Sequence, residues 1–109
     1  MGKFEIKKDK AGKFRFNLKA ANGLVVLTSE AYNTKAACDN GIASVKKNCG
    51  SDKCYDKKVA KNGKPYFNLK STNGQVIGSS QMYSSTSSMN KGIASVKNNA
   101  PKAEVKEDF

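Results

Sequence analysis

Side chains suited to acid–base or nucleophilic chemistry are scarce in this sequence of 109 residues. It contains no histidine, the side chain that most often moves protons near neutral pH. Serines recur, but no Ser-His or Cys-His pair can form, which leaves lysine as the base. The carboxylates Glu5 and Asp56 are expected on a solvent-facing strand surface, without the burial that would raise their pKa. We therefore expect a protein that is not an enzyme.

Three cysteines are the remaining residues with metal or redox chemistry. Cys38, Cys49 and Cys54 form an odd set, and the first residues of the chain lack the apolar core of a secretion signal, so reduced thiols are expected. Zinc sites draw their four ligands largely from cysteine and histidine, and histidine is absent. The sequence predicts no metal site and gives no indication of a cofactor.

A net charge of +11 favours anionic partners. Residues 1–50 carry ten basic and four acidic groups, and residues 51–109 carry ten and five, so the excess is spread along the chain. Nineteen of the twenty cations are lysines and the other is Arg15. Because guanine recognition in the major groove relies on the arginine fork, base-specific DNA binding is disfavoured, and weak nucleic-acid binding remains open beside a solubilising role.

The strongest pattern in the sequence is a tandem repeat. At an offset of 51, residues 4–48 align with residues 55–99, and 20 of the 45 positions are identical. The matching segments include F-N-L-K, N-G and G-I-A-S-V-K, each of which occurs twice.

The first part of each repeat has the pattern of three strands. Apolar and polar residues alternate in 4–7 and 14–19, and 24–27 is an apolar run. Asn22-Gly23 predicts a tight two-residue hairpin turn with positive φ at both residues. In the second repeat, Lys57 interrupts the apolar face of the first strand. Pro65 predicts that the next strand begins one residue later or lies at a sheet edge.

The last part of each repeat changes to a helical period. Cys38, Ile42 and Val45 recur at i, i+4 and i+7, as do their counterparts in the second repeat, so Cys38 is expected in the core. Asn33 or Thr34 is expected to cap the first helix, and Ser84 or Ser85 the second. The glycines at 41 and 92, inside the helices, indicate a close approach of the backbone to the sheet.

These elements predict an α+β fold in which two β-β-β-α repeats merge into one mainly antiparallel sheet with two helices on one face. One domain spans 1–109, with repeat one at 4–50, repeat two at 55–101 and a last strand or frayed tail at 102–109. The face opposite the helices is then open to solvent. On this open face we place a candidate polyanion-binding strip: Arg15, Asn17, Lys19, Tyr66, Asn68 and Lys70.

The repeated F-N-L-K, N-G and G-I-A-S-V-K segments, with serines at 29 and 80 and tyrosines at 32 and 83, resemble the YegP-like family of bacterial DUF1508 or UPF0339 proteins. The resemblance covers nearly the whole chain. It implies tandem β-β-β-α units in a single sheet, with terminal strands that can be exchanged between units. It implies no activity and supplies no catalytic or binding residues.

Three functional interpretations remain. The main one is a small, basic, non-catalytic binding module of unknown molecular function. One alternative is weak binding of nucleic acid or another polyanion through the open sheet face, although only Tyr66 of the sheet aromatics points outward. The other is a protein-interaction or self-association module that uses an unpaired sheet edge. No stretch reaches the length of a membrane helix, so we expect a cytoplasmic protein. We also expect a monomer rather than an oligomer.

Overall fold

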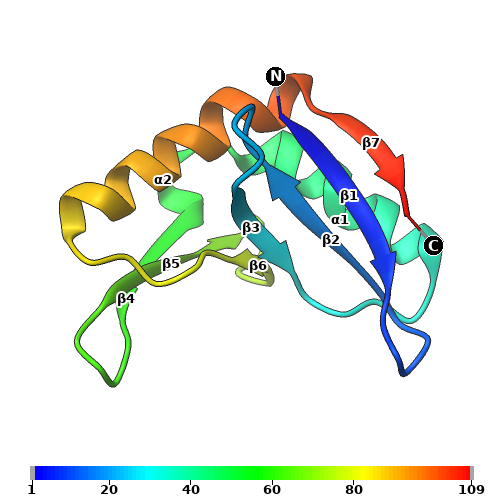
Figure 1. Ribbon diagram of the computed structural model, residues 1–109, viewed down its shortest axis with the longest axis horizontal. Coiled ribbons are helices and arrows are strands. Elements are labelled where there is room, and N and C mark those ends of the chain that lie inside the picture. The colour runs from blue at the N-terminus through cyan, green and yellow to red at the C-terminus, as the bar shows by residue number, and fades with distance from the viewer. Residues whose placement is uncertain (1, 109) are drawn as a thin grey trace.

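The computed structural model describes residues 2–108 and contains one seven-stranded sheet in the order β4-β5-β6-β3-β2-β1-β7 (Figure 1). The strands are β1 (Lys3–Lys8), β2 (Phe14–Lys19), β3 (Val25–Ser29), β4 (Tyr55–Val59), β5 (Pro65–Lys70), β6 (Val76–Ser79) and β7 (Glu104–Glu107). The helices are α1 (Lys35–Asn48) and α2 (Thr86–Asn99), followed by the short 3-10 turns Asp52–Cys54 and Ala100–Lys102. The sheet is antiparallel except for the pairing of β1 with β7.

The structure confirms the predicted α+β architecture. The two repeats meet where β3 pairs with β6 at the centre of the sheet. Both helices pack on one face, and a single hydrophobic core extends over both repeats. Each helix also contacts the other repeat, because α1 packs against β5 and β6 and α2 packs against β3. The two repeats therefore share one core.

Each repeat has a cluster of three aromatic rings in the core beneath its helix. In repeat one, Phe4 meets Phe16 edge-on at 5.6 Å, and Phe16 stacks on Tyr32 at 6.3 Å between ring centres. The second repeat has the same arrangement, with Tyr55 edge-on to Phe67 at 5.6 Å and Phe67 stacked on Tyr83 at 6.4 Å. A methyl group on Gly41 would overlap the hydroxyl of Tyr32 and approach Phe16 to 3.0 Å. The close approach expected at this glycine is therefore to a tyrosine side chain.

The hairpins differ from the expected two-residue turn. In the β2–β3 hairpin the Gly23 N–H donates to the Ala20 carbonyl and the Ala20 N–H donates to the Leu24 carbonyl, both at 2.9 Å. Gly23 has a φ of +85°, whereas no residue other than glycine has positive φ among residues 2–108. The expectation of positive φ at Asn22 was therefore wrong. The loop has three residues and a glycine bulge, and Asn22 accepts the Leu24 N–H through its side chain.

The expectation for Pro65 was also wrong. β5 begins at Pro65 itself, which lies opposite Val59 of β4, and β5 is an interior strand between β4 and β6. Proline is tolerated at the first residue of a strand, where it interrupts the ladder least. The free edge next to this proline is β4.

The helix caps and the recurring serines have structural roles. Thr34 accepts the Ala37 N–H at 3.1 Å, and Ser85 accepts the Ser88 N–H at 3.1 Å, so the second residue of each predicted pair is the cap. Ser29 is buried, accepts the Phe16 N–H at 2.9 Å and donates to a carbonyl at 2.7 Å. Its counterpart in the second repeat makes the same two bonds.

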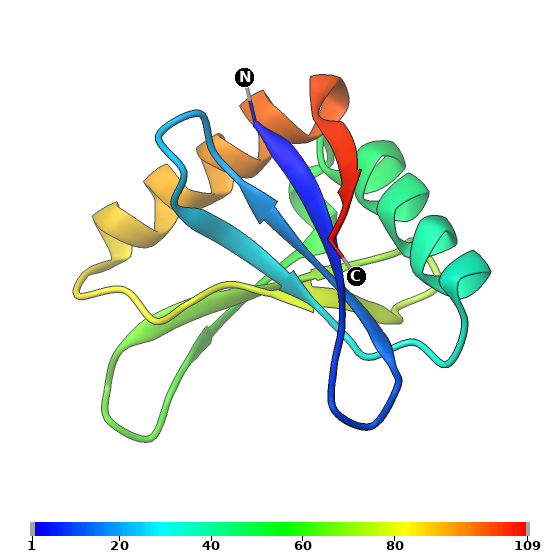
Figure 2. The same ribbon diagram turned by 45° about the vertical axis from the view of Figure 1, so that its right-hand side comes forward.

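The end of the chain forms β7, which lies beside β1 and runs parallel to it (Figure 2). Val105 is paired with Phe4 and Glu107 with Ile6, and the Asp108 N–H donates to the Ile6 carbonyl at 2.8 Å. The two outer strands of the sheet are therefore β4 and β7. Within residues 2–108, neither helix has the length and apolar character that crossing a membrane requires.

Candidate functional site

A row of polar residues crosses the open face of the sheet. The row has one residue on each strand, and each residue lies directly opposite the next one on the neighbouring strand. The β3–β6 pair is at its centre. Its halves are related by the repeat, since Glu5, Asn17 and Thr28 correspond to Asp56, Asn68 and Ser79. In order from β4 to β7, the row is Asp56, Asn68, Ser79, Thr28, Asn17, Glu5 and Lys106.

Each end of this row is a carboxylate between two lysines. Glu5 lies 2.8 Å from the Lys19 Nζ and 3.6 Å from the Lys3 Nζ. Its repeat mate Asp56 lies 3.0 Å from the Lys70 Nζ and is also bridged by a second lysine. The hydrogen bond from Lys19 is the main reason that the pKa of Glu5 falls below its usual range. Both carboxylates are therefore charged at neutral pH, and each cluster keeps one excess positive charge.

The structure places all six residues of the candidate strip on the open face, but the cations already have acidic neighbours. Lys19 and Lys70 pair with the two carboxylates of the row, and Arg15 lies 3.6 Å from Asp9. A hollow of about 490 Å³ lies between the repeats and is lined in part by Arg15 and Asn17. A bound phosphate would have to compete with carboxylates for these cations, which weakens the strip as an anion site.

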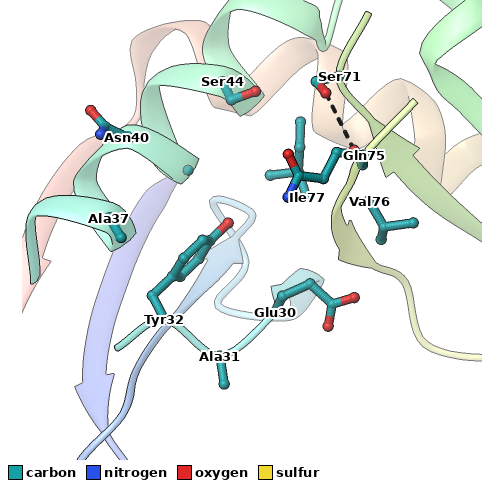
Figure 3. Close-up of a pocket in the computed structure, with 11 residues that line it drawn as sticks. Glu30, Ala31, Tyr32, Ala37, Asn40, Ser44, Ser71, Gln75, Val76 and Ile77 are labelled. Atoms are coloured by element: carbon teal, nitrogen blue, oxygen red, sulfur yellow. Dashed lines mark hydrogen bonds between the residues drawn. The ribbon is translucent and has the colours of Figure 1, made fainter. Parts of the chain in front are cut away.

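A second pocket lies between α1 and the β5–β6 hairpin of the other repeat (Figure 3). It has a volume of about 360 Å³, and the Tyr32 hydroxyl points into it, toward Gln75. Among the described residues that line it, Glu30 is the one with a charged side chain. Burial raises the pKa of the Tyr32 phenol, so it stays protonated at neutral pH. Hydroxyl and amide groups of this kind can bind a small polar molecule, but the lining pairs no nucleophile with a base.

Burial outweighs the nearby lysines at the thiols of Cys38 and Cys49 and raises the pKa of both. All three cysteines are free and buried, and burial raises the pKa of Cys38 to about 11. The prediction that Cys38 belongs to the core is confirmed. In the described part of the chain, no three His, Cys, Asp or Glu side chains gather as metal ligands.

A groove that sequence reasoning missed lies between β4 and α2. It has a volume of about 410 Å³ and is lined by Tyr55 and Lys57 of β4 and by Ile93 and Lys97 of α2, among others. Lys97 forms an ion pair with Asp52 and lies over the Tyr55 ring, 5.6 Å from its centre. Lys57, which interrupts the apolar face of this strand, lines the groove. The sequence does carry a signal for unequal sheet edges, because residues 103–106 (A-E-V-K) have the pattern of residues 4–7 (F-E-I-K) and supply one strand more than the two repeats.

Comparison with known proteins gives the family of the chain. The family described as "Domain of unknown function (DUF1508)" matches residues 9–56 and 60–107. The chain belongs to the DUF1508 family. The ranges matched to DUF1508 begin five residues later and end six residues later than the repeats predicted at 4–50 and 55–101. Each DUF1508 unit ends on the strand after its helix, β4 or β7, and that strand pairs with a strand outside its own unit.

Relatives of this DUF1508 protein carry the family name UPF0339. The chain is 58% identical to a UPF0339 protein of Acinetobacter baylyi over 97% of its own length and 96% of the relative's. It is 51% identical to the UPF0339 protein YegP of Escherichia coli strain K12, over 98% and 97% of the two lengths. These names state no activity.

Two solution NMR structures have the same fold. That of YegP from E. coli, titled a protein of unknown function, has a TM-score of 0.94 and 51% identity and covers 98% of this chain and 92% of its own. That of a UPF0339 protein from Shewanella oneidensis has a TM-score of 0.92 and 50% identity, with 97% and 90% covered.

Proposed function

We propose that this protein is a non-catalytic interaction module that takes an extended segment of another protein onto the free edge of β4. The observation that carries the proposal is the contrast between the two repeats. β1 and β4 pair with their neighbours in the same register, Phe4 with Leu18 and Tyr55 with Leu69. β1 is covered by β7, whereas β4 is the last strand on its side of the sheet.

The pairing of β1 indicates which backbone groups of β4 are available. The Ile6 carbonyl accepts the Asp108 N–H, so the polar backbone groups of Ile6 point toward β7. Lys57 is the repeat mate of Ile6, and the shared register directs its N–H and C=O to the uncovered side of β4. Such a row of edge groups is where an extended peptide adds to a sheet.

The groove beside β4 supports this proposal. Its apolar lining includes Tyr55 and Ile93, and side chains from every second residue of an added strand would enter it. Val59, at the end of β4, is 71% exposed and extends the apolar surface along the edge. The absence of histidine and the structural use of Ser29 favour a module that binds without catalysis.

The test uses random octapeptides selected by display against the immobilised full-length protein. We expect selected peptides to shift the amide NMR signals of Tyr55, Lys57 and Val59. A proline at an edge position whose N–H faces outward blocks strand addition and leaves the existing ladder intact. Lys57→Pro is therefore expected to weaken binding at least tenfold, about 1.4 kcal/mol or more, and Lys57→Gln much less.

Cross-strand contacts between β4 and β5 in the NMR spectra check that the Lys57→Pro variant is folded. If that variant does not fold, the shift map on the unchanged protein decides. Failure to select any peptide, or binding that leaves β4 unshifted, would overturn the proposal.

The open face supports a second candidate, weak binding of a polyanion. Cations outnumber carboxylates among the strand residues whose pairing places them there: Lys3, Lys7, Arg15, Lys19, Lys58, Lys70 and Lys106 against Glu5, Asp56 and Glu104. A labelled single-stranded oligonucleotide should bind weakly at about 50 mM salt and lose most of that affinity at about 200 mM. The double variant Lys19→Gln, Lys70→Gln should bind several-fold more weakly. Undetectable binding at low salt would exclude this candidate.

A further inference from the structure

We infer that the segment taken up by β4 runs parallel to it and is acidic, with an aliphatic residue opposite Tyr55 and an acidic residue opposite Lys57. This inference rests on the proposed function and adds the direction, register and charge of the bound segment. Its basis is β7, the strand that pairs with β1, because β1 is the repeat mate of β4 (Figure 2).

The direction and register follow from the β1–β7 pair. Val105 lies opposite Phe4 and Glu107 opposite Ile6, in parallel orientation. Paired residues of a parallel ladder point to the same face. Phe4 and Ile6 are fully buried on the helix side, so Val105 and Glu107 point to that side as well. A segment on β4 in the same register places an aliphatic side chain beside Tyr55 and Ile93, in the groove.

The charge of the segment follows from what replaces Ile6 in the second repeat. Lys57 stands at that position and lines the groove. Around β7, the carboxylates of Glu107 and Asp108 pair with Lys35 of α1 and Lys7 of β1. On β4 the lysine is supplied by the strand itself, and a carboxylate at the place of Glu107 would meet it directly.

The remaining charged groups of the groove leave it positive. Among the described residues that line the groove, Lys57 and Lys97 are balanced by Asp52 alone, whose pKa is held low mainly by the hydrogen bond from Lys97. The next edge residue, Lys58, takes the place of Lys7 and shares Asp56 with Lys70. An acidic pair at the places of Glu107 and Asp108 therefore complements the edge. An antiparallel pair of two β4 edges centred on Lys57 would instead bring the two Lys57 side chains against each other, which disfavours that edge-to-edge dimer.

The first probe is the octapeptide Lys-Ala-Glu-Val-Lys-Glu-Asp-Phe, the sequence of residues 102–109, added to the isotope-labelled full-length protein. We expect shifts along β4 and at the groove residues of α2. The β1 amides should not shift, since β7 already covers that strand. Replacing the Glu-Asp pair of the peptide with Lys-Lys should weaken binding at least tenfold. A scrambled peptide of the same composition controls for net charge.

A charge exchange tests the contact itself. Lys57→Glu should reverse the preference, so that the Lys-Lys peptide binds more tightly than the acidic one. The matched control is Lys10→Glu, which makes the same change of net charge in the exposed β1–β2 turn and should leave the preference unchanged.

The outcomes separate the inference from the proposed function. If peptides bind β4 but the acidic and Lys-Lys forms bind equally, the acidic preference is overturned and the edge function stands. If display-selected and acidic peptides both leave β4 unshifted, the edge function itself is overturned. Shifts at β1 would show exchange with β7, and shifts confined to the open face would show binding elsewhere; either result contradicts the inference.

Discussion

At the scale of single residues, most positions shared by the two repeats have structural roles. The hydroxyl of Ser29 accepts the hydrogen bond of the Phe16 N–H on the neighbouring strand, in place of a backbone carbonyl, and its counterpart in the second repeat does the same. Gly41 makes room for Tyr32, and Gly92 does the same for Tyr83. Residues that recur in this way can resemble a catalytic set. Here they recur because both repeats have the same packing and hydrogen-bonding requirements.

The glycines give the first prediction. In Gly92→Ala the new methyl overlaps the Tyr83 hydroxyl, and overpacking costs about 1–3 kcal/mol, against about 1 kcal/mol returned by the helix propensity of alanine. We expect the free energy of unfolding, measured in urea, to fall by up to about 2 kcal/mol. The control is Gly50→Ala, where the methyl meets no atom within 4 Å. Equal stability of the two variants would contradict this account of the packing.

The second prediction concerns acid stability. Lysine neighbours lower the pKa of Glu5 from 4.5 and that of Asp56 from 3.8, so both favour the folded state when ionised. Their contribution is present above these ordinary values and is lost as pH falls through the lower folded pKa. Between neutral pH and about pH 3, Glu5→Gln should therefore lose less stability than the unchanged protein. Parallel urea titrations across this range measure it, and identical pH profiles would count against the ion pairs.

At the scale of elements, three strands share one pattern but not one environment. β1 and β4 occupy equivalent places beside β2 and β5, and β7 is an additional strand beside β1. The sheet is therefore symmetric except at its edges. The β1 side is finished by the end of the chain, and the β4 side is left with a groove, which is the basis of the proposed function.

The third prediction is that removing residues 104–109 converts β1 into a second free edge. Backbone groups of β1 that face β7 would then meet water, and the adjoining side chains Phe4 and Ile6 would be partly uncovered. Hydrogen exchange at β1 should accelerate, and stability should fall by about 1–3 kcal/mol. The octapeptide of residues 102–109, added back, should restore protection at β1. Unchanged exchange in the truncated protein would show that β7 does not cover this edge.

At the scale of the whole molecule, the two repeats form one cooperative unit. The central β3–β6 pair contains Thr28 opposite Ser79, and each helix packs on strands of the other repeat. A unit of about 50 residues buries too little apolar surface to be stable alone.

The fourth prediction follows from this sharing. Fragments 1–50 and 51–109 should each lack cooperative thermal unfolding when separate, and an equimolar mixture should regain it, because the central strand pair and the β1–β7 pair both join the two fragments. Circular dichroism at increasing temperature measures this. Cooperative unfolding of either fragment alone would contradict the shared core.

The repeat, the strand and helix periods, the family resemblance and the polar strip on one sheet face can all be predicted from the order of the amino acids. These features depend on local alternation and on comparison within the chain. Tertiary structure decided the rest. The turn at Asn22-Gly23 depends on how two strands close their ladder, and the acidic partners of Lys19 and Lys70 lie on neighbouring strands. The open edge at β4 exists because β7 pairs with β1 in parallel, and strand order is set by contacts between residues far apart in the chain.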